Sequence, residues 1–182
     1  MKRSLIICGS LLLLLAQSTA AQQGTMEFGI DSNIGYILTD DVNGFEADDV
    51  FAIAIPTTAF RFGYFVSNQV SIEPALAVDF FTSDGDSFLD LSLSAGVLYH
   101  FSADPAKTRP FVRFSPTIRL IDRGDNSASQ FGLVGQAGIK APLKGPLAAK
   151  IAVGVKRDFE NDDFFGATTI FGTFGLSFFV DR

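Results

Sequence analysis

The chain has 182 residues, enough for one domain, and carries 20 acidic against 14 basic residues. It contains no basic patch or basic helix, which argues against binding to nucleic acid. Twenty phenylalanines and 17 glycines, without a tryptophan, oppose long helices.

Residues 1–21 have the pattern of a cleavable signal peptide. Two basic residues precede an apolar run over 5–15, and small residues at 18–21 supply a cleavage site. The apolar run is too short to span a bilayer as a helix. We expect cleavage after Ala21, which leaves residues 22–182 as one exported domain.

Removal of the signal peptide changes the chemistry available to the chain. The net charge falls from −6 to −8, because the leader removes Lys2, Arg3 and no acid. Cys8 is the only cysteine and lies within the leader. We therefore expect a mature chain without disulfides, thiol catalysis or cysteine-bound metals.

After residue 21, apolar and polar residues alternate almost throughout, which is typical of β-strands. We predict eight strands, at residues 25–38, 50–66, 70–82, 88–101, 110–121, 130–142, 147–159 and 166–180. The apolar phase of the second strand changes near Pro56, which predicts a bulge there. Pro74 and Pro116 also interrupt strands, and we expect bulges or strand ends at both.

The segments between the strands alternate in charge. Four are polar and acidic, at residues 39–49, 83–87, 122–129 and 160–163, whereas those at 67–69, 102–109 and 142–146 carry little acid. An even number of strands puts both termini at the neutral end. The acidic segments could bind Ca²⁺ or Mg²⁺, but the EF-hand spacing is absent and solvated turns explain them as well. Arg123-Gly124-Asp125 matches an integrin-binding tripeptide, for which chance is the simpler explanation.

The composition of the polar face indicates which face of the sheet points inward. This face is rich in Gly, Ala, Ser and Thr, with single charges between them. Glycine weakens a solvent-facing strand, whereas the narrow lumen of an eight-stranded barrel requires small residues. We therefore expect the polar face inside and the apolar face against lipid, where only a closed barrel is permitted.

Charged residues on this inner face have opposite signs on opposite walls. We expect a structural network that comprises Glu27, Asp31, Glu73, Asp79 and Asp90 facing Arg113, Arg119, Lys140, Lys150 and Lys156. Paired charges are stable in a lumen where isolated ones are costly. The alternative is a narrow path that conducts ions.

Aromatic residues of the apolar face gather near both strand ends, as expected of two interfacial girdles. The neutral end has Phe28, Phe62, Tyr64, Tyr99, Phe101 and Phe178, and the acidic end has Tyr36, Phe80, Phe88, Phe131 and Phe159.

Several features of the sequence occur together: the leader, the eight alternating strands, the hairpin FRFGYFVSNQVSIEPALAVDF at 60–80, GVLYHF at 96–101 and GTFGLSFFV at 172–180. In these features the chain resembles the small outer-membrane β-barrels of the OmpA/OmpX type. The resemblance implies a C-terminal assembly signal, matched by Gly175, Phe178 and Val180, which the outer-membrane insertion machinery reads. The chain differs by ending on Asp181-Arg182 instead of an aromatic residue.

Some small outer-membrane barrels modify lipid A, so catalysis needs consideration. His100 is the only histidine, and its parity and position place it in the lumen near the neutral end, far from the outer leaflet. A hydrogen-bonded structural role explains it better than a general base. We expect no enzyme, cofactor or metal, but a monomeric structural or surface-interaction protein of a Gram-negative outer membrane, in contact with lipid and lipopolysaccharide. A narrow channel is the alternative, and a lipid A enzyme is the third.

Overall fold

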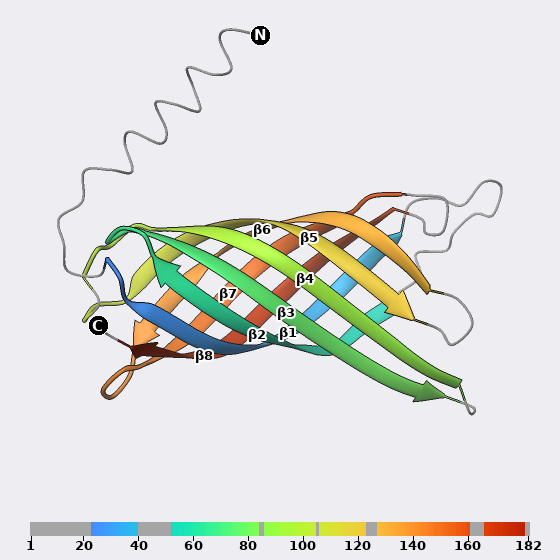
Figure 1. The fold of residues 1–182 in the computed structure, drawn as a ribbon, viewed down its shortest axis with the longest axis horizontal. Coiled ribbons are helices and arrows are strands. Elements are labelled where there is room, and N and C mark those ends of the chain that lie inside the picture. The colour runs from blue at the N-terminus through green and yellow to red at the C-terminus, as the bar shows by residue number, and fades with distance from the viewer. Residues whose placement is uncertain are drawn as a thin grey trace, which may run out of the picture.

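The chain forms a closed barrel of eight antiparallel strands (Figure 1). The computed structural model describes residues 23–39, 52–83, 86–104, 106–122, 127–160 and 166–180, without the side chains of 37–39, 52–56, 79–88, 122 and 127. The strands are β1 (Met26–Thr39), β2 (Ala52–Phe65), β3 (Val70–Ser83), β4 (Asp86–His100), β5 (Arg109–Asp122), β6 (Ser127–Pro142), β7 (Leu147–Asp158) and β8 (Ala167–Val180). The described residues include no helix long and apolar enough to cross a membrane.

The predicted strands are confirmed, with every boundary within three residues of its expected position. Each strand pairs with its neighbour in sequence, and β1 pairs with β8 from Met26↔Val180 to Thr39↔Ala167. This last ladder closes the barrel and leaves no sheet edge. It also brings the start of β1 and the end of β8 to the same end of the barrel, as the even strand number predicts (Figure 1).

The two ends of the barrel differ in their connections. Short turns at 66–69 and 143–146 join strands at the end where β1 begins, together with the longer connection at 101–108, and we call this the turn end. Gly145 has a φ of +67°, a conformation that glycine adopts without a steric penalty. We call the opposite end, where β1 ends and β2 begins, the loop end. The acidic segments and Arg123-Gly124-Asp125 lie largely outside the described residues.

The outside of the barrel is apolar all the way round. Among the described residues, each of the eight strands carries large hydrophobic side chains that are about half exposed. Val153 on β7 is 66% exposed. The inside holds the buried charges, among them Glu27, Glu73 and Lys140. This arrangement confirms the predicted inward orientation of the polar face, and it is the reverse of a soluble barrel.

The barrel accommodates the three prolines that were expected to interrupt strands, Pro56, Pro74 and Pro116, in two different ways. Beside Pro56, the β1–β2 register shifts between Asn33 and Gly35, which confirms the predicted bulge. Pro74 and Pro116 lie inside strands whose registers run without a shift, so the expectation of bulges or strand ends there is wrong.

The pairing around Pro74 and Pro116 explains how a closed barrel accommodates them. Each proline pairs on one side, Pro74 with Ala95 and Pro116 with Leu133. On the other side the ladder is interrupted: no pair is formed at the level of Phe62 opposite Pro74, nor at the level of Ala95 opposite Pro116. A proline has no N–H to donate, and a local gap in the ladder satisfies that constraint without a register change.

Candidate functional site: the barrel lumen

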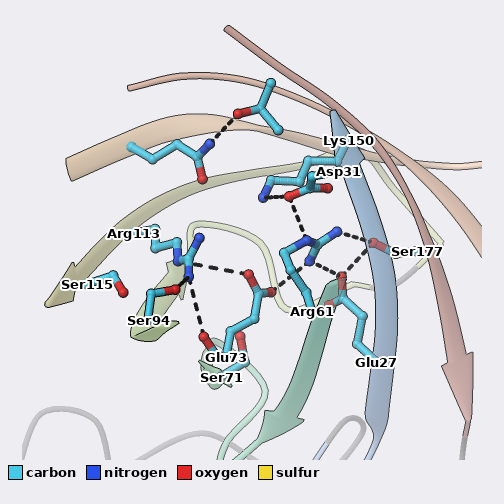
Figure 2. Close-up of polar contacts among 12 residues, drawn as sticks. Glu27, Asp31, Arg61, Ser71, Glu73, Ser94, Arg113, Ser115, Lys150 and Ser177 are labelled. Atoms are coloured by element: carbon cyan, nitrogen blue, oxygen red, sulfur yellow. Dashed lines mark hydrogen bonds and ion pairs between the residues drawn. The ribbon is translucent and has the colours of Figure 1, made fainter. Parts of the chain in front are cut away.

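Arg61 on β2 is the centre of a buried charge network. Its guanidinium lies 2.9 Å from Glu73, 3.2 Å from Glu27 and 2.7 Å from Asp31, measured between nitrogen and carboxylate oxygen. It also donates a hydrogen bond of 3.1 Å to Ser177, whose hydroxyl donates to Glu27 at 2.6 Å. Figure 2 shows the Arg61 side chain between these partners, which come from β1, β3 and β8. One arginine thus joins carboxylates from both neighbouring strands.

Two lysines reach the same carboxylates from the opposite wall. Lys140 on β6 lies 2.7 Å from Glu27 and 3.2 Å from Glu73. Lys150 on β7 lies 2.8 Å from Asp31. Their side chains are fully buried. The contacts cross the lumen and therefore tie distant strands together directly.

The network balances its charge where it is most deeply buried. Three carboxylates, of Glu27, Asp31 and Glu73, face three cations, of Arg61, Lys140 and Lys150. Burial of an isolated ion costs several kcal/mol, whereas paired and hydrogen-bonded ions persist. Because its charges balance, the network forms a stable plug across the lumen.

Glycines provide the space that these side chains occupy. Gly29 pairs with Arg61 across the β1–β2 ladder, and a Cβ at Gly29 would collide with the Arg61 guanidinium. Gly175 pairs with Asp31, and a Cβ there would collide with the Asp31 carboxylate. A long charged side chain therefore lies over a glycine of the adjacent strand. This close approach gives a physical reason for the glycines on the polar face.

An aromatic layer closes the turn end of the lumen. Phe65, Leu98 and Phe111 are at most 1% exposed. The Arg109 guanidinium lies 5.4 Å from the Phe65 ring centroid and 5.1 Å from that of Phe179, within cation–π range. The layer lies between the charge network and the turns, so the lumen is blocked twice at this end.

His100 belongs to this aromatic layer. Its ring stacks on Phe65 at 5.2 Å between centroids, and its Nε2 forms a 3.2 Å hydrogen bond with the Ser71 hydroxyl. Both His100 and Ser71 are fully buried, and His100 Nδ1 has no hydrogen-bond partner among the described residues. A serine nucleophile needs an accessible hydroxyl and a base oriented by a third group. This pair has neither.

The half of the lumen toward the loop end is more open. A cavity of about 310 Å³ lies there, lined by residues of all eight strands. Asp90 pairs with Arg119 on the adjacent strand, and Lys156 pairs with Asp158 on its own strand at 2.9 Å. The Arg119 side chain is 31% exposed, whereas that of Lys140 in the network is fully buried. Solvent therefore reaches the outer half of the lumen, whereas the side chains of the network are at most 5% exposed.

Several solved structures of outer-membrane proteins are similar to this barrel in fold. Over 86% of this chain and 99% of its own, Neisserial surface protein A matches with a TM-score of 0.63 at 12% identity. The outer membrane protein AlkL matches over 92% and 95% with a TM-score of 0.59 at 14% identity. OprG from Pseudomonas aeruginosa matches over 91% and 100%, with a TM-score of 0.57 at 10% identity. The fold is that of the small outer-membrane β-barrels. No protein-family model and no curated protein sequence matches the chain.

Within this outer-membrane barrel fold, most of the predicted lumen residues come together, although in a different arrangement. The structure places Glu27, Asp31, Glu73, Asp90, Arg113, Arg119, Lys140, Lys150 and Lys156 inside the barrel, each with an oppositely charged partner. The side chain of Asp79 lies outside the description. Segregation of acids and bases onto opposite walls is wrong, because Arg61 lies between the acidic strands and Asp158 lies beside Lys156.

Sequence reasoning missed several residues of the lumen. Arg61 falls on the inner face by parity, as do Asp158 and Arg109, but none was assigned to the network. Phe65 and Phe111 also occupy inward-facing positions of the alternating pattern, which indicates an apolar layer inside the barrel. The interpretation of the inner face as polar did not include this layer. Of the assembly-signal residues, Phe178 and Val180 point outward at 46% and 41% exposure, while Gly175 faces Asp31.

Proposed function

We propose that the chain is a non-catalytic, non-conducting barrel of the outer membrane, with a structural or surface-interaction role. The observation that carries this proposal is the double closure of the lumen, by the charge network centred on Arg61 and by the aromatic layer around Phe65 and Phe111. An ion would have to displace fully buried ion pairs and then cross tightly packed rings. Both steps oppose conduction.

The exterior supports placement in lipid. Apolar side chains such as Phe114 (58% exposed), Val153 (66%) and Leu176 (57%) surround the barrel, where a soluble protein would present polar groups. The aromatic pairs Phe28–Phe62 near the turn end and Phe131–Phe159 near the loop end, with centroids 5.2 and 5.8 Å apart, suit the two interfaces. Membrane lipid and lipopolysaccharide are thus the proposed surroundings of a monomer.

Cell fractionation tests this placement. We expect the protein in the outer-membrane fraction, with residues 1–21 removed and a faster-migrating band on gels of unheated samples. We also expect Phe178→Ala to reduce this compact band in cells if residues 175–180 act as the assembly signal. Fully soluble protein without a compact band would contradict the membrane placement.

Conductance measurements in planar lipid bilayers test closure against the alternative of a narrow channel. The cavity and the partly exposed Arg119 at the loop end are what a channel mouth would require. We expect no discrete current steps from the purified barrel, even at high salt. Reproducible unitary steps, altered by a network substitution such as Arg61→Met, would favour the channel.

Lipid A analysis tests the remaining enzyme hypothesis. Cells that express His100→Ala should have the same lipid A acylation and hydrolysis pattern as cells that express the original chain. His100 and Ser71 are fully buried in the aromatic layer, so no acyl group reaches them. A change in lipid A that follows the His100 substitution would overturn the non-catalytic proposal.

A further inference from the structure

The cavity in the outer half of the lumen has walls of two chemical kinds. Small apolar residues and one ring form part of it, namely Ala59, Ala75, Ala77 and Phe171. Charged, amide and hydroxyl side chains form most of the rest. Its volume of about 310 Å³ is at the lower end of the size range of small-molecule sites, roughly 300–1,000 Å³. The cavity has room for a small organic molecule.

The charged side chains of this cavity do not balance. Three acids line it, Asp31, Asp90 and Asp158, against four bases, Arg61, Arg113, Arg119 and Lys156. Arg61, Arg119 and Lys156 each have a partner among these acids within 3 Å. Arg113 does not, because its only carboxylate contact, Glu73 at 4.0 Å, is not part of the cavity lining. Glu73 also pairs with two other cations of the network, so Arg113 adds one positive charge beyond the balanced set.

Arg113 has only weak contact with a carboxylate. Its Nε lies 4.0 Å from Glu73 Oε1, which is beyond hydrogen-bond distance. The other oxygen of this carboxylate, Oε2, lies 2.9 Å from Arg61 and 3.2 Å from Lys140. Its two hydrogen bonds both leave from Nη2, to the Ser94 hydroxyl at 3.2 Å and to the Glu73 carbonyl at 3.4 Å. Figure 2 shows this guanidinium beside Ser94 and Glu73.

Some N–H groups of the Arg113 guanidinium therefore lack a hydrogen-bond acceptor, although the side chain is only 9% exposed. Nε has no hydrogen-bond partner among the described residues, and the same is true of the Thr117 hydroxyl, which belongs to another cavity-lining residue of β5. Elsewhere on the cavity wall, the oxygens Asp31 Oδ1, Gln136 Oε1 and Asp158 Oδ1 are also without a hydrogen-bond partner among the described residues. Unpaired buried donors are costly, and a guanidinium gains most from an anion. The β5 side of the cavity thus favours one negatively charged group of an occupant, whereas the unpaired oxygens on β1, β6 and β7 would repel a second one.

We propose that this cavity binds a small organic monocarboxylate, with its carboxylate at Arg113 and its aliphatic part against the alanine wall. One uncompensated positive charge matches one negative charge. A polyanion would face Asp31, Asp90 and Asp158, so it is disfavoured. A bare inorganic anion would leave the apolar wall without contact. The partly exposed Arg119 and Lys156 mark the side from which solvent, and hence a small acid, reaches the cavity.

Titration of the full barrel in lipid nanodiscs tests this site. The probe is butyrate, followed through the side-chain Nε–H resonance of Arg113, and the matched neutral probe is butyramide. We expect a saturable shift with butyrate at millimolar concentration, and binding of butyramide at least about tenfold weaker, because the ionic hydrogen bond is lost. Chloride and phosphate at equal concentration should not compete with butyrate.

Two cavity variants and one distant control make the test specific. Arg113→Gln should weaken butyrate binding by about tenfold or more, whereas Arg113→Lys should retain part of it. Ala77→Leu should abolish binding by filling the cavity without a change in charge. Lys107→Gln removes a positive charge at the turn end, where the side chain is 77% exposed, and should leave binding unchanged.

Each variant is first shown to form the compact band on an unheated gel, so that a loss of binding is not a loss of fold. If Arg113→Gln does not form that band, Ala77→Leu supplies the test. Lack of a saturable shift below roughly 100 mM butyrate, equal binding of butyramide, or full binding by a folded Ala77→Leu or Arg113→Gln variant would each overturn the proposal.

Discussion

Substitution of Arg61 by methionine perturbs the network at its centre. The change removes a cation that contacts Glu27, Asp31 and Glu73 at distances from 2.7 to 3.2 Å. Each contact near 3 Å is worth roughly 5 kcal/mol at an effective dielectric constant of about 20, before desolvation is subtracted. Without Arg61 the three carboxylates keep only two close cations, Lys140 and Lys150. Arg113 stays 4.0 Å from Glu73, so one buried carboxylate is left without a close partner of its own.

The expected loss of stability follows from this imbalance. Removal of one partner from a buried ion pair costs about 3–5 kcal/mol, and we expect Arg61→Met to fall in that range. Addition of Glu73→Gln restores the charge balance, and should recover about 1–3 kcal/mol as coupling energy. Lys107→Met, which breaks only the exposed Lys107–Asp104 pair, should change stability by less than about 0.5 kcal/mol.

Equilibrium unfolding by urea in lipid vesicles measures these differences. The chain has no tryptophan, so circular dichroism and the mobility of the unheated band replace tryptophan fluorescence as probes. A destabilisation of Arg61→Met below about 1 kcal/mol would refute the reasoning, because it would mean that the network contributes no more than surface ion pairs.

Three further predictions use the same assay. Gly29→Ala should cost about 1–3 kcal/mol, because its Cβ would collide with the guanidinium at the centre of the network, whereas Gly135→Ala, with nothing within 4 Å, should change stability by less than about 0.5 kcal/mol. Val153→Arg in the middle of β7 should cost about 2–4 kcal/mol in lipid, and an equal stability of both forms would argue against contact with hydrocarbon. Phe111→Ala should cost about 3–5 kcal/mol as a cavity opens in the aromatic layer, and a neutral result would mean that the layer is not closely packed.

Strand positions and the inward face were predictable because a barrel wall imposes one period of two on every strand. The apolar side chains of β7, Ile151, Val153 and Val155, alternate with buried Ala152 and Gly154. The phase change at Pro56 was visible for the same reason. The alternation of apolar and polar residues does not show where a strand ladder lacks a hydrogen bond. The expectation of bulges or strand ends at Pro74 and Pro116 was therefore wrong.

The partners inside the lumen were less predictable, because parity fixes the side of the wall but not the level along the barrel axis. Asp90 pairs with Arg119 on the adjacent strand, which depends on the β4–β5 register. Arg61 stands between two acidic strands, so its role appears only once Gly29 and Ala75 are known to lie beside it. The signs of the inward-facing charges were enough to predict a network. The strand register was needed to identify Arg61 as the residue at its centre.

Spin-label accessibility along β7 tests the inside-out arrangement most directly. Cys8 is the only cysteine, so single cysteines at 151, 153 and 155 and at 152 and 154 can be labelled in a Cys8→Ser chain reconstituted in lipid vesicles. We expect frequent collisions with lipid-soluble oxygen for labels at 151, 153 and 155. For labels at 152 and 154, which point into the lumen, we expect few collisions with either oxygen or a water-soluble nickel chelate. Frequent collisions with the nickel chelate at the three outward positions would contradict the inside-out arrangement.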